Sequence, residues 1–120
     1  MEDIFLKFAR QLIPSEILES FNVVDINDDS TTELIISLIE KENLIPSSEK
    51  ELVLNGFLKE VELTHFPANG RACYLRLKRR RWKVKNEPTN PTSYYNNYDF
   101  TVDGTKATKN FGAFLKSFSK

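Results

Sequence analysis

The feature that most limits how this chain folds is a turn with alternating apolar and polar residues on both sides of it. Residues 57–64 alternate before the turn at residues 67–70, and residues 71–84 alternate after it, as half-buried strands do. The apolar positions predicted to face the core on the later strand are Cys73, Leu75 and Leu77. At Trp82 the apolar positions have moved to even numbers, so we expect a bulge, or the end of the pairing, near residues 79–81.

Helices are predicted towards both ends of the chain. Residues 3–12 carry apolar side chains at helical spacing, and a short second helix starts at Pro14, a residue that suits a first helical turn. Near the C-terminus, Thr108 is placed to cap a third helix. The apolar residues of this third helix recur at i, i+3, i+4 and i+7, and they are Phe111, Phe114, Leu115 and Phe118.

Two strands are predicted between the second helix and the central turn. Residues 21–26 are rich in β-branched side chains and precede a cluster of turn-forming residues at 27–30. Residues 32–39 fit a returning antiparallel strand, but they also fit a helix capped by Ser30 or Thr31. Both alternatives stay open because a short apolar run satisfies either period.

The remaining segments complete the predicted fold. Residues 86–97 contain two prolines, four asparagines and no aliphatic residue, which predicts a mobile loop. Residues 98–102 can form a last short strand, followed by a turn at 103–104. Because strands adjoin strands and helices lie at the ends, we predict one domain, residues 1–120, of the α+β class. Its small antiparallel sheet has about four to five strands, with N- and C-terminal helices.

The formal net charge is zero, from 17 basic and 17 acidic residues, but the two halves of the chain have opposite charges. Residues 1–62 hold 5 basic and 14 acidic residues, a net charge of −9, whereas residues 63–120 hold 12 basic and 3 acidic residues, a net charge of +9. Such a division suggests an anionic partner for the basic half. The simpler alternative is that the two halves pair with each other within one fold.

The basic half concentrates its charge in residues 76–85, where seven of ten residues are lysine or arginine. The guanidinium group of an arginine can donate two parallel hydrogen bonds to two phosphate oxygens, and a nearby aromatic ring can stack on a base. The predicted nucleic-acid-binding residues are Arg76, Lys78, Arg79, Arg80, Arg81, Trp82, Lys83 and Lys85. Two alternatives stay open: the run is a solvated edge strand, and Trp82 belongs to the core. Likewise, Tyr94, Tyr95 and Tyr98 could stack on bases or pack against the domain.

The sequence offers few residues for catalysis or metal binding. Cys73 and His65 are the only cysteine and the only histidine, too few for a structural zinc site. We interpret His65 as a rim residue, and Asp25, Asp28 and Asp29 as turn and cap residues, because their spacing does not match a calcium loop. We therefore expect a protein that is not an enzyme and needs no metal or cofactor. No apolar run approaches the roughly 20 residues of a membrane helix, and no signal-peptide pattern is seen, which favours a cytoplasmic address.

Four stretches, in this order, resemble the N-terminal region of a group of bacterial insertion-sequence transposases. They are residues 12–18 (LIPSEIL) with 21–25 (FNVVD); residues 41–46 (KENLIP); residues 55–57 (NGF) leading through 66–70 (FPANG) to 74–82 (YLRLKRRRW); and residues 104–116 (GTKATKNFGAFLK). Together they cover nearly the whole chain. The order of the RRRW strand before the GT and FxxFLK helix is the most specific part of the resemblance.

The resemblance implies a non-catalytic DNA-binding role at transposon ends, in the cytoplasm at the nucleoid, in partnership with a separate catalytic transposase domain or chain. Related regions follow a similar basic strand with a cysteine-rich zinc knuckle, whereas residues 83–87 contain no cysteine. The competing expectation is a protein-interaction module, in which the acidic half and the basic strand pair with another protein or with a second copy.

Overall fold

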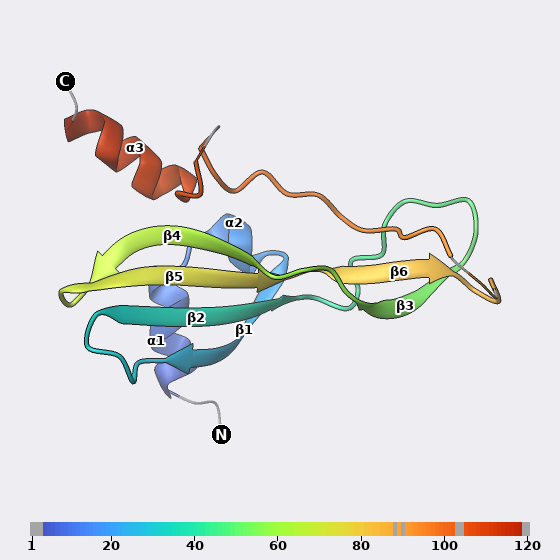
Figure 1. Cartoon of the computed structure of the whole chain (residues 1–120), viewed down its shortest axis with the longest axis horizontal. Coiled ribbons are helices and arrows are strands. Elements are labelled where there is room, and N and C mark those ends of the chain that lie inside the picture. The colour runs from blue at the N-terminus through green and yellow to red at the C-terminus, as the bar shows by residue number, and fades with distance from the viewer. Residues whose placement is uncertain (1–3, 88, 90, 103–104, 119–120) are drawn as a thin grey trace.

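The computed structural model describes residues 4–87, 89, 91–102 and 105–118 (Figure 1). Its helices and strands in chain order are α1 (Ile4–Leu12), α2 (Ser15–Leu18), β1 (Phe21–Asn27), β2 (Glu33–Glu40), β3 (Leu52–Phe57), β4 (Val61–Ala68), β5 (Arg71–Lys78), β6 (Arg80–Val84) and α3 (Lys109–Phe118). Helices lie towards both ends of the chain and strands lie between them, which confirms the predicted α+β class.

The larger of two sheets has the strand order β1-β2-β5-β4. Its outer pairs, β1 with β2 and β4 with β5, are antiparallel, but the central pair, β2 with β5, is parallel. The sheet is therefore mixed and not fully antiparallel as the sequence predicts. The reason is that β2 and β5 come from different hairpins and meet where their buried rows align. The aligned pairs are Leu34 with Cys73, Ile36 with Leu75, and Leu38 with Leu77.

Residues 32–39, which the sequence leaves open between strand and helix, form a strand. Every second side chain is buried from Leu34 to Glu40, and this alternation runs one residue beyond the predicted end of the strand. The hydroxyl oxygen of Ser30 accepts the backbone N–H groups of Thr32 (3.1 Å) and Glu33 (3.2 Å). Ser30 thus closes a turn before a strand, where the alternative interpretation made it a helix cap.

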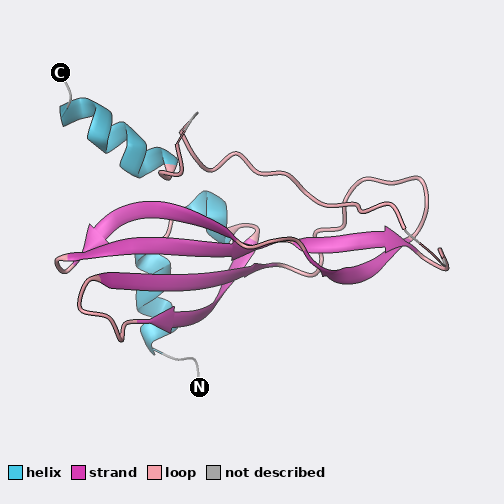
Figure 2. Ribbon diagram, in the orientation of Figure 1, coloured by secondary structure: helices cyan, strands magenta, loops and turns pink. Residues whose placement is uncertain are grey.

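Strands β3 to β6 form one long hairpin that is divided between the two sheets (Figure 2). Its turn contains Asn69 (φ +52°) and Gly70 (φ +76°), a left-handed pair that matches the twist of adjoining strands. Beyond β4 and β5 the pairing breaks, and the Leu58 N–H donates to the Arg79 carbonyl (2.9 Å) before β3 and β6 pair as a second sheet. This confirms the interruption predicted near residues 79–81.

Strand β3 is not predicted from the sequence. Its register against β6 shifts between Leu54 and Phe57, at a bulge that contains Gly56. Gly56 has a φ of +80°, a left-handed conformation that other residues adopt only with strain. Because the bulge interrupts the alternation and only Leu52 is buried on this strand, the period-of-two pattern is too short to be seen.

The hydrophobic core lies on one face of the larger sheet. Helices α1 and α2 cover this face (Figure 1), and Ile13 and Ile17 pack there against the buried rows of the strands. Phe21 joins the same cluster and makes edge contacts with the rings of Tyr98 (5.1 Å) and Phe100 (6.0 Å between centroids). The segment that leads to α3 therefore helps to close the core.

The short strand predicted at residues 98–102 is wrong. Tyr98 and Phe100 stack on each other at 5.0 Å and pack against the core, and the segment runs beside β4 without forming a strand (Figure 1). In the described part of this segment, the only strand-like pairing is a single bridge between Thr101 and Thr108. The turn predicted at 103–104 lies outside the described residues.

Helix α3 confirms the predicted C-terminal helix and its cap. The Phe111 N–H donates to the Thr108 hydroxyl oxygen at 3.4 Å. The rings of Phe111 and Phe114 both contact Phe66 on β4, at 5.3 and 5.2 Å. Within the described part of residues 86–97, the only strand-like pairing is a bridge from Tyr94 to Trp82, so the predicted loop is present and its mobility stays a prediction.

Candidate nucleic-acid interface

The eight predicted binding residues lie on β5, between β5 and β6, on β6 and just after it, along the arm of the hairpin that runs from the larger sheet into the two-stranded sheet (Figure 1). Arg76 and Lys78 belong to β5, and Arg79 lies between the two strands. The remaining residues belong to β6 or directly follow it: Arg80, Arg81, Trp82, Lys83 and Lys85. The interruption of the hairpin therefore separates the basic run into two short strands with different surroundings.

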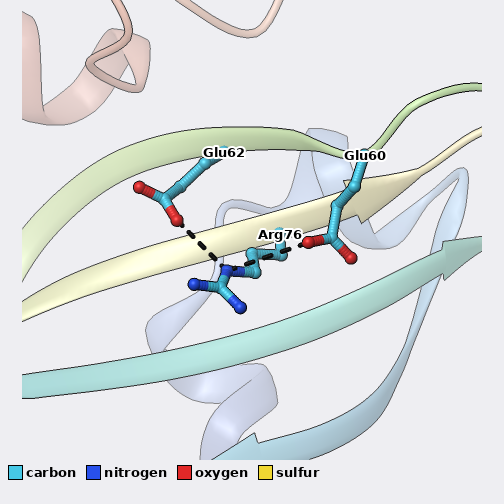
Figure 3. A network of polar contacts seen from close by, with 3 residues as sticks. All are labelled: Glu60, Glu62 and Arg76. Atoms are coloured by element: carbon cyan, nitrogen blue, oxygen red, sulfur yellow. Dashed lines mark hydrogen bonds and ion pairs between the residues drawn. The ribbon is translucent and has the colours of Figure 1, made fainter.

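Three of the seven cations in this set form ion pairs with acidic residues of the N-terminal half. Arg76 lies between Glu62 (3.1 Å) and Glu60 (3.8 Å), as Figure 3 shows. The other two pairs are Arg80 with Glu42 (3.7 Å) and Lys85 with Glu51 (3.6 Å). Exposed pairs of this kind contribute at most about 1 kcal/mol each. The simpler alternative, that the two halves neutralise each other, thus accounts for part of the basic run.

The other four cations, Lys78, Arg79, Arg81 and Lys83, have no carboxylate within ion-pair distance among the described residues. Arg81 donates from Nε to the Asn55 carbonyl (2.8 Å), which positions the guanidinium without cancelling its charge. The Lys78 ammonium lies 5.4 Å from the centre of the Phe57 ring. We call these four residues the cationic strip. Their contacts to neutral groups hold part of the strip in place and leave its positive charge available to an anion.

Trp82 is buried, with 5% of its surface exposed. Its backbone pairs with Leu54 of β3 on one side and with Tyr94 on the other, where both N–H to carbonyl distances are 2.8 Å. The indole N–H has no hydrogen-bond partner in the part of the chain that the structure describes. Trp82 therefore forms the small core of the second sheet, and the alternative of a stacking platform on the surface is not supported.

Two exposed aromatic rings lie beside the cationic strip. Tyr95 is 43% exposed and lies under the Arg79 guanidinium at 5.3 Å, whereas Phe57 is 38% exposed and lies near both Lys78 and Arg80. Sequence reasoning includes Tyr95 among three loop tyrosines but does not single out Phe57. One signal could have identified Phe57: it directly follows Gly56. A glycine inside a strand often marks a bulge, and a bulge can turn the next side chain outwards.

A buried carboxylate joins the two sheets behind this strip. Glu40, at the end of β2, is 1% exposed, and its Oε1 accepts the Arg80 backbone N–H at 2.8 Å. Its Oε2 accepts the Asn96 side-chain amide (3.2 Å) and the Tyr98 hydroxyl. Burial, together with the hydrogen bond to Glu40 and its negative charge, raises the pKa of Tyr98 well above its ordinary value of 10. Glu40 therefore holds β2, β6 and the segment after the loop together.

The prediction that His65 is a rim residue is wrong, because this side chain is only 6% exposed. His65 Nδ1 lies 2.7 Å from the Thr108 hydroxyl, and Nε2 lies 2.8 Å from the Leu12 carbonyl. A neutral ring that donates from Nε2 and accepts at Nδ1 satisfies both contacts. His65 thus links the end of α1, β4 and the cap of α3, three segments far apart in the sequence.

We expect the protein to lose stability on mild acidification because of His65. Burial lowers the pKa of His65 below its ordinary 6.5, although the hydrogen bond to Leu12 opposes the shift. The unfolded chain therefore binds this proton at a higher pH than the folded protein does. The contribution of neutral His65 to the free energy of unfolding is fully present above pH 6.5. Below pH 6.5 the free energy of unfolding falls, by up to about 1.4 kcal/mol per pH unit, until the lowered pKa is reached.

Urea unfolding between pH 7.5 and 5 measures this dependence. The variant His65→Gln, whose amide can still donate to Leu12 and accept from Thr108, is expected to be less stable at pH 7.5 but to lose part of the pH slope. An unchanged slope in that variant would assign the acid sensitivity to other groups.

Comparisons of this chain with protein-family models, curated proteins and solved structures found no significant match. Among the described residues, each helix is too short or too polar to cross a lipid bilayer. Within those same residues, no three His, Cys, Asp or Glu side chains lie close enough together to hold a metal ion. The geometry of the cationic strip is therefore the main guide to function.

Proposed function

We propose that this chain is a non-catalytic DNA-binding domain of a transposase-like protein that contacts the nucleic-acid backbone through β6 and the residues just before it. The observation that carries the proposal is the group of four cations without an acidic partner among the described residues: Lys78, Arg79, Arg81 and Lys83. Phosphate contacts of this kind position a protein on DNA without reading the base sequence. Transposon ends as the target, a separate catalytic chain as the partner and a nucleoid location belong to the same proposal.

The shape of the second sheet supports this proposal. A two-stranded ribbon is narrow enough to enter the major groove of B-form DNA. Strands β3 and β6 form such a ribbon, and it projects from the larger sheet (Figure 2). Arg76, Arg80 and Lys85 already pair with acidic residues of this chain. We therefore assign the phosphate contacts to the four cations of the cationic strip.

Fluorescence anisotropy with labelled duplex DNA at several salt concentrations tests the proposal. If four phosphates are neutralised, the logarithm of the binding constant should fall with a slope of roughly 3.6 against the logarithm of salt concentration. The triple variant Lys78→Ala, Arg81→Ala, Lys83→Ala should reduce that slope by about 2.7. Arg79 is kept in this variant because it holds the end of the loop through Asn96 and Asn97.

A matched control removes three lysines from α1 and the C-terminal segment: Lys7→Ala, Lys106→Ala and Lys116→Ala. It changes the net charge equally, and it should retain the wild-type slope. Equal losses in both variants would indicate a general charge effect. Absence of binding by the folded wild type at low salt would overturn the proposal and favour the protein-interaction module, for which sedimentation velocity without nucleic acid should show self-association.

A further inference from the structure

A cavity of about 280 Å³ lies between the larger sheet and residues 97–101. Its walls come from β1, β4, β5 and this segment. The residues that line it are Phe21, Val61, Leu63, Leu77, Arg79, Asn97, Tyr98, Phe100 and Thr101. The aliphatic and aromatic residues among them are Phe21, Val61, Leu63, Leu77, Tyr98 and Phe100, polar atoms make up about half of the exposed lining, and Arg79 is the one formally charged group at neutral pH.

The Arg79 side chain is held in one orientation at this cavity. Its Nη1 donates to the Asn96 carbonyl (3.0 Å) and to the Asn97 side-chain oxygen (3.1 Å), and its guanidinium lies 5.3 Å from the centre of the Tyr95 ring. Nε and Nη2, the pair that forms a side-on fork for a carboxylate, make no hydrogen bond within the described residues. Binding an anion there would need little reorganisation.

The apolar walls and this fork together define the chemistry of a ligand. Phe21, Leu63 and Leu77 are almost fully buried, so the wall they form is fixed by the core behind it. The Tyr98 hydroxyl is already committed to Glu40, and its raised pKa keeps it protonated, so it adds no negative charge to the cavity. The pocket therefore offers apolar walls next to polar groups, with Arg79 as the single site for a negative charge.

We propose that this cavity binds a small organic carboxylate with an apolar body. The carboxylate accepts two hydrogen bonds from Nε and Nη2 of Arg79, and the hydrocarbon part lies against Phe21, Leu63 and Phe100. The size is sufficient, since a cavity of about 150 Å³ already holds benzene. This inference goes beyond the proposed function and does not depend on it, although an occupied Arg79 could not contact a phosphate at the same time.

The test is an NMR titration of the ¹⁵N-labelled full chain with sodium octanoate, and separately with 1-octanol, without nucleic acid. We expect saturable shifts of amides in β5 and in residues 97–101 on addition of octanoate. Octanol, which has the same chain without the charge, should bind at least about tenfold more weakly, as should octanoate to Arg79→Gln. Arg79→Lys, which keeps the charge but not the fork, should also bind more weakly than the wild type.

A second variant blocks the cavity without altering Arg79. Thr101→Phe adds a ring to the wall and should abolish the octanoate shifts while the protein stays folded, as judged by its dispersed spectrum. Equal affinity for octanol and octanoate, shifts that map elsewhere, or no saturable binding by the folded wild type at millimolar octanoate would each overturn the proposal. Because nucleic acid is absent, loss of the proposed DNA-binding function would leave these outcomes unchanged.

Discussion

Replacing Glu40 with alanine is expected to destabilise the protein by about 3–5 kcal/mol, because a buried carboxylate that serves three donors would be removed. The Arg80 backbone N–H, the Asn96 amide and the Tyr98 hydroxyl would each lose their acceptor on Glu40. A donor left buried without an acceptor costs about 1–3 kcal/mol. The free energy of unfolding in urea measures the loss, and a change below 1 kcal/mol would contradict this account of the cluster.

Glu42→Ala is the matched control for this substitution. Glu42 is also an acidic residue that contacts Arg80, through an ion pair of 3.7 Å, but its side chain is 74% exposed. Its removal should therefore cost less than about 1 kcal/mol. Tyr98→Phe should cost an intermediate amount, since it deletes one donor to the carboxylate and leaves the others in place.

Replacing Trp82 with alanine is expected to cost about 3–5 kcal/mol, since it empties the centre of the second sheet. The loss should be local, with faster amide hydrogen exchange in β3 and β6 than in β5. Trp82→Phe should cost much less, because it keeps an aromatic ring and removes an indole N–H that has no partner among the described residues. Urea unfolding and hydrogen exchange of both variants measure these effects.

The same pair of variants tests how Trp82 takes part in the proposed DNA binding. If its role is to support β6, Trp82→Phe should bind DNA with wild-type affinity and wild-type salt dependence. A folded Trp82→Phe protein that loses most of its affinity would contradict the structural role and return Trp82 to the surface as a stacking residue.

The parts of the fold that could be predicted from the sequence are those that local patterns determine. The helices, the turn at Asn69 and Gly70 and the buried row of β5 follow from capping, turn chemistry and periodicity. The parallel pairing of β2 with β5 could not be predicted, because it joins two hairpins across a long stretch of chain. The false strand at residues 98–102 has a similar cause, since an aromatic run can pack on a core as readily as it can extend a sheet.

In the candidate site, too, local patterns could be predicted and contacts between distant residues could not. The basic run is visible in the sequence, but the distinction between paired and unpaired cations depends on acids that fold against it, such as Glu62 beside Arg76. His65 was misassigned because its partners, Leu12 and Thr108, are 53 and 43 residues away. Glu40 did leave a signal, since it continues the alternation of β2 by one step and so belongs to the buried face.

The hairpin that both sheets share also predicts an order of assembly. The turn at residues 69–70 closes the shortest loop, so β4 and β5 meet at the lowest entropic cost, and pairing then spreads away from the turn. It reaches β3 and β6 last, past the break at Arg79, and there it gains only the small cluster around Trp82. We therefore expect the ribbon that carries Arg81 and Lys83 to pair last and to open first, so the surface proposed to contact DNA should be the least stable part of the hairpin.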